Sequence, residues 1–187
     1  DRMAAAMGIP EIKVRVFEVE PVNGLAAPDG RIFLTRGFLN RKAQGEVTAE
    51  ELASVIAHEM GHVAQGHMRR RMIDFTGQNA VFVMLSALLS RFLPFIGVWI
   101  ANLISTALMA RLSRRDEFEA DAWATALLIK AGIGTGPQKS LFRKLDALTR
   151  NRAEGIPAWL LSHPHVEERI AAIEANEARW GRPGQVS

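Results

Sequence analysis

The sequence predicts an α+β protein that is mostly helical, with a small antiparallel β-sheet beside one central helix. Short runs that alternate apolar and polar residues occur only before about residue 36, whereas helical patterns fill the chain from about residue 48 onward. The chain has 187 residues, 48% of them hydrophobic, which suits one domain with a substantial core. We therefore expect a single domain over residues 1–187, with an apolar helical hairpin at about 79–110.

The predicted sheet comes from two segments near the N-terminus. Residues 1–8 resemble the end of a helix, and residues 12–19 alternate apolar with basic side chains, which predicts a half-buried strand. Residues 22–27 and 31–35 flank the turn at 28–30, Pro-Asp-Gly, and so predict a short β-hairpin.

The central helix is predicted to run from about residue 48 to about residue 68, after a short helix at 37–43. Thr48 with Glu51 three residues later forms a capping box, which marks the start of the helix. Apolar residues lie nearly all round the helix, so we expect it to be buried.

This helix carries the motif His58-Glu59-Met60-Gly61-His62. Two histidines four residues apart share one helix face, so both imidazoles can reach one metal ion. The glutamate beside the first can reach a water molecule on that metal, which is the arrangement of zinc hydrolases. A lone histidine on a helix is usually a packed or surface residue, but this pair with a glutamate between them favours a metal site.

Composition limits the alternatives. The chain has no cysteine, which excludes disulfides and thiolate zinc sites, and it has only five histidines from which a histidine-rich site can be built. The net charge is +3, and the basic residues are not interleaved with aromatic ones, so nucleic-acid binding has little support.

The predicted hairpin is the most apolar part of the chain. Residues 79–110 carry one charge, Arg91, and residues 92–110 carry none. Two membrane spans need about 40 residues, and this segment is shorter. If residues on both sides of it bind one metal, a single span would separate them by a bilayer. A helical hairpin is therefore favoured, either buried in the protein or dipping into a membrane face.

A third metal ligand is expected after the hairpin. His67 is five residues from His62 and so lies about 140° round a continuous helix, which excludes it. Glu117 is a better candidate, on a helix predicted at 113–131, and Asp121 shares its face and can hydrogen-bond a ligand histidine. A charged, solvated helix face is the alternative. Further helices are predicted at 138–149 and from Ser162-His163-Pro164 to about 179, with an apolar stretch at 159–161.

Four segments together resemble peptidase family M48. They are Val22 to Gly37 (VNGLAAPDGRIFLTRG), in which Gly24 replaces the family's alanine; His58 to His62; Ser113 to Asp121, similar to S-R-x-x-E-x-x-A-D; and Ser162-His163-Pro164 with Arg169-Ile170, similar to H-P-x-x-x-R-I. The resemblance implies a zincin-like metalloprotease fold and one zinc ion per chain.

The resemblance also implies roles for individual residues. His58, His62 and Glu117 would bind zinc, Glu59 would be the general base, and Asp121 would orient a ligand histidine. His163 would stabilise the oxyanion or occupy the open zinc position, with a helix-capping histidine as the alternative. Arg169 would pair with a carboxylate of the site unless it is a surface residue. The strand comprising Arg31, Ile32, Phe33, Leu34 and Thr35 would lie at the cleft edge, where a substrate adds as a β-strand.

The sequence thus predicts a zinc metalloendopeptidase that acts on polypeptides, with a role in protein or membrane-protein quality control. One alternative is a catalytically silent, metal-stabilised module that binds peptides like a chaperone. Another is a structural membrane protein with an incidental motif. Membrane contact is expected through the 79–110 hairpin or a segment before Asp1, and arginines at both ends of the hairpin favour the cytoplasmic face over the periplasm.

Overall fold

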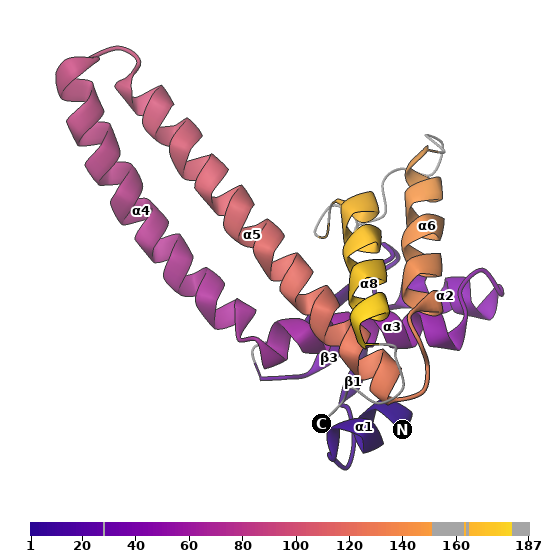
Figure 1. Ribbon diagram of the computed structural model, residues 1–187. Coiled ribbons are helices and arrows are strands. Elements are labelled where there is room, and N and C mark those ends of the chain that lie inside the picture. The colour runs from indigo at the N-terminus through magenta and orange to yellow at the C-terminus, as the bar shows by residue number, and fades with distance from the viewer. Residues whose placement is uncertain (28, 151–162, 164, 181–187) are drawn as a thin grey trace. The chain divides into compact units, whose positions relative to one another are not determined.

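The computed structural model describes residues 1–27, 29–150, 163 and 165–180, which form two compact units (Figure 1). Unit 1 comprises residues 1–65 and 117–187, and unit 2 comprises residues 66–116. The described chain is mostly helical with one small sheet, as predicted. Pro28, the 151–155 loop, the apolar stretch at 159–161, Ser162 and Pro164 lie outside the described residues.

The sheet of unit 1 has three strands, β1 (Val14–Phe17), β2 (Gly24–Ala26) and β3 (Ile32–Thr35), in the order β1-β3-β2. β2 and β3 form the predicted antiparallel hairpin, but β1 pairs with β3 in parallel, so the sheet is mixed and not antiparallel. The expectation that the first strand is half-buried is also wrong. All four β1 residues are exposed, Phe17 to 50%.

The central position of β3 corrects the prediction that this strand lies at the cleft edge. β3 pairs with a strand on each side, so its backbone cannot accept a third strand. Its side chains at Ile32, Leu34 and Thr35 are buried. The strand that ends the sheet next to the motif helix is β2, which packs against that helix. Arg31, just before β3, is exposed and pairs with Asp29.

The motif helix, α3 (Ala49–Ala64), follows α2 (Arg36–Ala43) and starts at the predicted capping box. Thr48 accepts a hydrogen bond from the Glu51 amide, and Glu51 accepts one from the Thr48 amide. The helix ends earlier than residue 68 because Gly66 adopts a left-handed conformation, with φ of 66°. His67 therefore begins a new helix, and this break, not its angle round α3, separates it from the motif.

The core of unit 1 holds α3 in place on two sides. On one side α6 (Gly136–Arg150) and α8 (Val166–Trp180) pack on α2 and α3. The residues of this cluster include Phe38, Leu52, Val55, Leu141, Phe142, Leu145, Ile170 and Ile173. On the other side, Met3 of α1 (Arg2–Met7) joins Ala57 of α3 and Leu128 of α5 (Gly97–Lys130). Both faces of α3 are thus covered, as its all-round apolar pattern predicts.

Unit 2 is a helical hairpin made of α4 (His67–Phe92) and the first part of α5 (Gly97–Lys130). Both helices are longer than expected. α5 continues into unit 1 without a break, so the helix predicted at 113–131 is its second half. At the end of the hairpin away from its turn, Asp116 accepts hydrogen bonds from Arg70 and Arg71, each of 3.1 Å, and the His67 ring lies 3.8 Å from the same carboxylate.

Candidate metal centre

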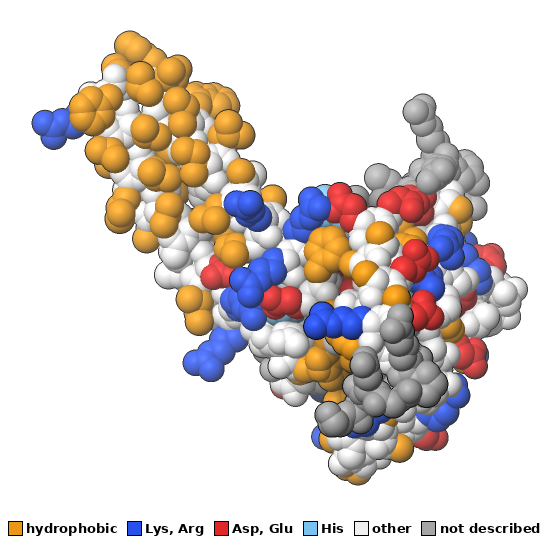
Figure 2. Space-filling view, viewed as in Figure 1, with side chains coloured by type: hydrophobic (Ala, Val, Ile, Leu, Met, Phe, Trp, Pro, Cys, Tyr) orange, Lys and Arg blue, Asp and Glu red, His pale blue; other side chains and the backbone are white. Residues whose placement is uncertain are grey.

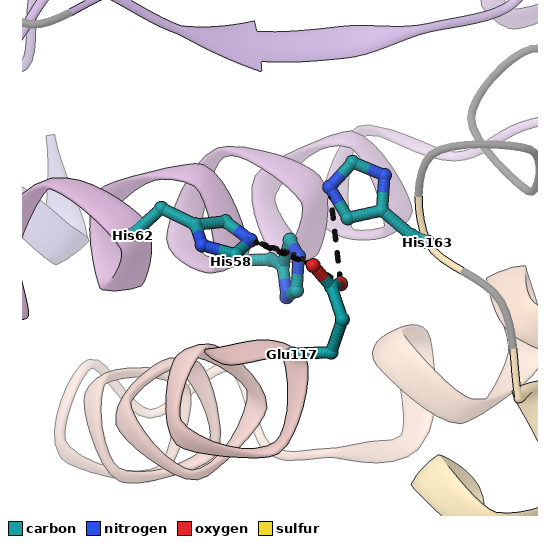
Figure 3. A group of neighbouring side chains, drawn as sticks. All are labelled: His58, His62, Glu117 and His163. Carbon is teal, nitrogen blue, oxygen red and sulfur yellow. Dashed lines mark hydrogen bonds and ion pairs between the residues drawn. The ribbon is translucent and has the colours of Figure 1, made fainter. Parts of the chain in front are cut away.

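Two helices of unit 1 bring the three predicted ligands together. His58 and His62 project from one face of α3, and Glu117 projects from α5 toward them (Figure 3). The Nε2 atoms of the histidines lie 3.1 Å apart. His58 Nε2 lies 3.4 Å from Glu117 Oε2, and His62 Nε2 lies 3.4 Å from Glu117 Oε1. All three residues are at most 5% exposed. Residues separated by more than 50 positions in sequence thus converge on one point.

Gly61, inside the motif, is what allows this approach of α3 and α5. A Cβ at this position would lie 2.7 Å from the carbonyl oxygen of Ala120 and 2.9 Å from its Cα. Both atoms belong to the α5 backbone, so neither can turn away. Glycine at position 61 therefore sets the distance between the two helices that carry the ligands.

His163 is the fourth member of the cluster. Its ring is almost fully buried, and its Nε2 lies 3.9 Å from Glu117 Oε2 (Figure 3). One potential ligand atom from each of His58, His62, Glu117 and His163 lies within 4.8 Å of the others. Burial, followed by the nearby charge of His58, lowers the pKa of His163 to about 3, so its ring is neutral at physiological pH.

The geometry fits a tetrahedral metal ion. With bonds of about 2.0–2.1 Å, ligand atoms at the corners of a tetrahedron are about 3.3 Å apart. The two histidine nitrogens are 3.1 Å apart, and each lies 3.4 Å from the Glu117 carboxylate, His58 from Oε2 and His62 from Oε1, so the spacing of the three groups is close to this value. Burial raises the pKa of Glu117, but hydrogen bonds with His58 and His62 outweigh it and hold the pKa well below its usual range, so this ligand is ionised.

Asp121, one turn after Glu117 on α5, orients the first ligand histidine. Its Oδ1 lies 2.8 Å from His58 Nδ1, so Nδ1 keeps its proton for this hydrogen bond and Nε2 is the nitrogen left for a metal. Burial lowers the pKa of His58, but Asp121 and then Glu117 raise it to about 9, so a metal ion would have to displace the proton of Nε2. Asp121 is itself held by Arg169, whose Nε and Nη2 donate hydrogen bonds of 2.6 and 2.9 Å, and by Gln138 Nε2 at 3.4 Å. Burial raises the pKa of Asp121, but Arg169 and His58 lower it to about 2.

Arg169 contacts several residues of the site at once. Besides Asp121, it donates from Nη1 to the backbone carbonyl of His163 at 3.0 Å, and its Nη1 lies 3.5 Å from Glu117. The side chain is fully buried, so the alternative of a surface arginine on the last helix is wrong. The α8 helix begins at Val166, after the predicted start at residues 162–164, and Arg169 lies in its first turn.

Glu59 lies beside the cluster, and its two carboxylate oxygens differ in their hydrogen bonds. Its carboxylate accepts a hydrogen bond from the Ala26 amide of β2, and its Oε1 is buried with no hydrogen-bond partner among the described residues. His163 Nε2 is 3.6 Å from that same atom. Burial raises the pKa of Glu59 to about 7, which suits a group that accepts and returns a proton near neutral pH.

Three contributors to the site are absent from the predicted set. They are Gly61, Gln138 and the Ala26 amide. Gly61 could have been singled out, because a glycine inside a buried helix costs stability unless another backbone comes close. Gln138 is fully buried and also accepts a hydrogen bond from Thr125, but a single glutamine in an amphipathic helix gives no signal in the sequence. The Ala26 amide depends on how β2 packs on α3, which the sequence does not show.

The Gly61 contact yields a direct prediction. Gly61→Ala is expected to push α5 away from α3, destabilise the protein by about 1–3 kcal/mol and weaken metal binding. Urea unfolding and zinc titration measure the two effects. Gly136→Ala is the matched control, because a Cβ there meets nothing within 4 Å. Equal stability and zinc affinity for both variants would show that the close helix approach is not required.

Comparison with known proteins shows which peptidase family this chain resembles. Residues 1–177 match peptidase family M48. The chain is 30% identical to the metalloprotease LoiP of Escherichia coli, with 86% of the chain and 64% of LoiP covered. It is 28% identical to a protease HtpX homolog of Janthinobacterium, with 93% and 69% covered. It is 29% identical to the mitochondrial metalloendopeptidase OMA1 of Schizosaccharomyces pombe, with 92% and 49% covered.

The chain spans about two thirds of the first of these bacterial relatives and about half of the yeast one. The family match covers both the HExxH motif of α3 and the segment that contains Glu117 and Asp121. The chain therefore belongs to peptidase family M48 and carries the metal-dependent peptidase domain of that family.

Proposed function

We propose that this protein is a zinc-dependent metalloendopeptidase with His58, His62 and Glu117 as the metal ligands. The observation that carries the proposal is the convergence of these three buried groups beside a glutamate whose Oε1 has no hydrogen-bond partner among the described residues. Two imidazole nitrogens and one carboxylate form the donor set of many catalytic zinc sites. Two imidazoles and a carboxylate, in a chain without cysteine, favour zinc over metals that prefer thiolate or all-oxygen ligands.

The chemistry that zinc supplies when bound is polarisation of the scissile carbonyl and acidification of a water molecule. Glu59 Oε1 faces the ligand cluster and accepts the proton of that water, then returns it to the leaving amine. His163, whose ring centre lies 4.9 Å from that of His58, donates a hydrogen bond to the oxygen that gains negative charge in this proposal. Asp121 and Arg169 keep the His58 ring in the required tautomer and orientation.

The substrate peptide is proposed to add to the outer edge of β2 in place of the strand at 31–35. The residues on either side of β2 hydrogen-bond toward β3: Asn23 accepts from the Thr35 amide, and Ala27 donates to the Arg31 carbonyl. By alternation, the backbone groups of Gly24 and Ala26 point to the opposite edge. The Ala26 amide reaches Glu59 from there, so a peptide along this edge runs past the catalytic group.

Zinc content and casein cleavage test the proposal together. Purified protein is expected to hold one zinc ion per chain and to cleave casein, and a chelator is expected to stop the cleavage until zinc is restored. One bound zinc without cleavage of casein or other unfolded proteins would favour a silent, metal-stabilised peptide-binding module. Absence of both zinc and cleavage would favour a structural protein with an incidental motif.

We further propose that the protein acts at a membrane, with polypeptides of the membrane or its surroundings as substrates and a role in their quality control. Support comes from α4, which is the one helix among the described residues that is long and apolar enough to cross a bilayer. None of the most apolar stretch of this helix is buried. The cytoplasmic face is preferred to the periplasmic one because arginines lie at both ends of the hairpin.

A further inference from the structure

The helix α6 packs against α3 and α8, and its two faces differ in character. The exposed face is charged: acidic and basic side chains lie together over α6 and α8 in Figure 2, and Arg143 Nη2 lies 3.6 Å from Glu174 Oε1. The inner face carries Gln138 and Phe142, which are four residues apart and therefore share one side of the helix. Both residues are at most 2% exposed. α6 therefore presents an amide and an aromatic ring to the interior of unit 1.

The guanidinium of Arg169 is fully buried, and polar groups surround its edge. Nε and Nη2 donate hydrogen bonds to Asp121, and Nη1 donates one to the backbone carbonyl of His163. Nη2 also lies 3.3 Å from His58 Nδ1, and Nη1 lies 3.5 Å from Glu117 Oε2. A guanidinium is flat and its N–H groups lie in its plane, so these contacts hold its edge. They leave its flat faces to be held by something else.

The Phe142 ring covers one flat face of this guanidinium. The Cζ atom of Arg169 lies 4.5 Å from the centre of the ring. The face of an aromatic ring carries partial negative charge, so it attracts a cation, and more strongly where both groups are removed from water. Both groups are buried here. The ring therefore stabilises a buried positive charge and resists a tilt of the guanidinium out of its plane.

Gln138 contacts the carboxylate that this guanidinium holds. Its Nε2 donates a hydrogen bond of 3.4 Å to Asp121 Oδ1, and its Oε1 accepts one of 3.3 Å from Thr125 Oγ1. Asp121 Oδ1 is also the atom that lies 2.8 Å from His58 Nδ1. The inner face of α6 is thus connected to a predicted ligand histidine through the Asp121 carboxylate.

We propose that Phe142 and Gln138 are positioning residues of the metal centre. They act on His58 through the ion pair of Arg169 with Asp121, so α6 sets the orientation of that imidazole. The inference rests on the proposed metal site and adds two residues to it that do not touch the metal. Loss of a residue that supports a metal ligand usually weakens metal binding by about 10- to 100-fold. Phe142 is expected to have the larger effect because its ring contacts a full charge, whereas the Gln138 hydrogen bond is long.

Phe142→Leu separates positioning from apolar packing. Leucine stays apolar but removes the ring, so zinc affinity is expected to fall by at least about tenfold. Phe38→Leu is the matched control, because Phe38 of α2 is equally buried in the same apolar cluster. Both variants lose core volume and stability, but Phe38→Leu is expected to keep the parent affinity. Competition with a chromogenic chelator measures affinity on folded protein. An equal loss in both variants would show that Phe142 acts only through packing.

Fluorinated phenylalanines at position 142 make the test specific to the charge of the ring face. Each added fluorine atom withdraws electron density from that face and weakens its attraction for a cation, with little change in ring shape. Zinc affinity is expected to fall stepwise from phenylalanine to its monofluoro, difluoro and trifluoro forms. The same replacements at position 38 are expected to give no such trend. An affinity that does not depend on the number of fluorine atoms at position 142 would overturn the role given to the ring.

Gln138→Met tests the second positioning residue. Methionine has nearly the same length but no amide, so it removes the hydrogen bond to Asp121 with little change in volume. Zinc affinity is expected to fall by about tenfold, less than in Phe142→Leu. Gln44→Met, at an exposed position after α2, is the control. The parent affinity in Gln138→Met would refute the assignment of Gln138.

A measurement on the metal-free protein keeps this inference separate from the proposed function. The Arg169 Nε–H group is buried and donates to Asp121, so NMR is expected to show that its hydrogen exchanges slowly with solvent. Phe142→Leu is expected to lose this protection, and Phe38→Leu to keep it. A parent protein that binds no zinc would contradict the proposed metal site, while the exchange data would still decide the role of Phe142. Equal protection in the parent and in Phe142→Leu would contradict the positioning role.

Discussion

Glu59→Gln is expected to reduce casein cleavage by at least about 10²- to 10⁴-fold, the usual contribution of a general base. Glutamine keeps the size of the side chain and can still accept a hydrogen bond from the Ala26 amide, but it cannot take a proton from water. The folded state and the metal ligands should be unaffected, since Glu59 lies outside the set of His58, His62 and Glu117. Cleavage rates and zinc content measured on the same preparation separate catalysis from metal loss.

Glu50→Gln is the matched control for this variant. Glu50 lies in the first turn of the same helix but is exposed, so its replacement should leave the cleavage rate unchanged. If Glu59→Gln kept the parent rate while holding one zinc, Glu59 would not be the base, and another buried group such as His163 would have to fill that role. If it lost zinc, its low activity would carry no information about the base.

Glu117→Ala is expected to weaken zinc binding by more than about 100-fold. Loss of a residue that only supports a metal ligand usually weakens binding by about 10- to 100-fold, and Glu117 is itself a proposed ligand. The variant removes one of three ligands and leaves two histidines whose Nε2 atoms lie 3.1 Å apart. Competition with a chromogenic chelator measures the affinity, and far-ultraviolet circular dichroism reports whether α5 remains folded. Glu11→Ala, at an exposed position of unit 1, is the control.

Unchanged zinc affinity in Glu117→Ala would contradict the ligand assignment. It would mean that zinc binds elsewhere or that His163 replaces Glu117, and a further His163→Ala substitution in the same chain separates these cases. If the double variant also held zinc with the parent affinity, the reading of the chain as a structural membrane protein with an incidental motif would gain support.

Local spacing explains why the ligands could be predicted from the sequence. His58 and His62, and likewise Glu117 and Asp121, are four apart, and any helix places such pairs on one face. The capping box of Thr48 and Glu51 is equally local, and the structure contains it. These predictions needed only the period of a helix. The resemblance to family M48 then indicated that the two pairs face each other.

Contacts between distant segments explain what the sequence did not reveal. The position of β3 between β1 and β2 depends on a parallel pairing that no turn specifies, so the choice of edge strand was wrong. The predicted end of α3, at about residue 68, was wrong for a different and local reason. A glycine in a helical pattern ends the helix when it adopts a positive φ, as Gly66 does, and the sequence does not show that angle. The burial of Arg169 depends on two carboxylates of another helix.

The roles of the site residues beyond their positions stay predictions. A zinc-loaded crystal, measured on both sides of the zinc absorption edge, tests the central claim most directly. We predict one strong anomalous peak in unit 1, at about 2.0–2.2 Å from His58 Nε2, His62 Nε2 and a carboxylate oxygen of Glu117. A peak that lies away from these three atoms, or no peak in a protein that cleaves casein, would contradict the account.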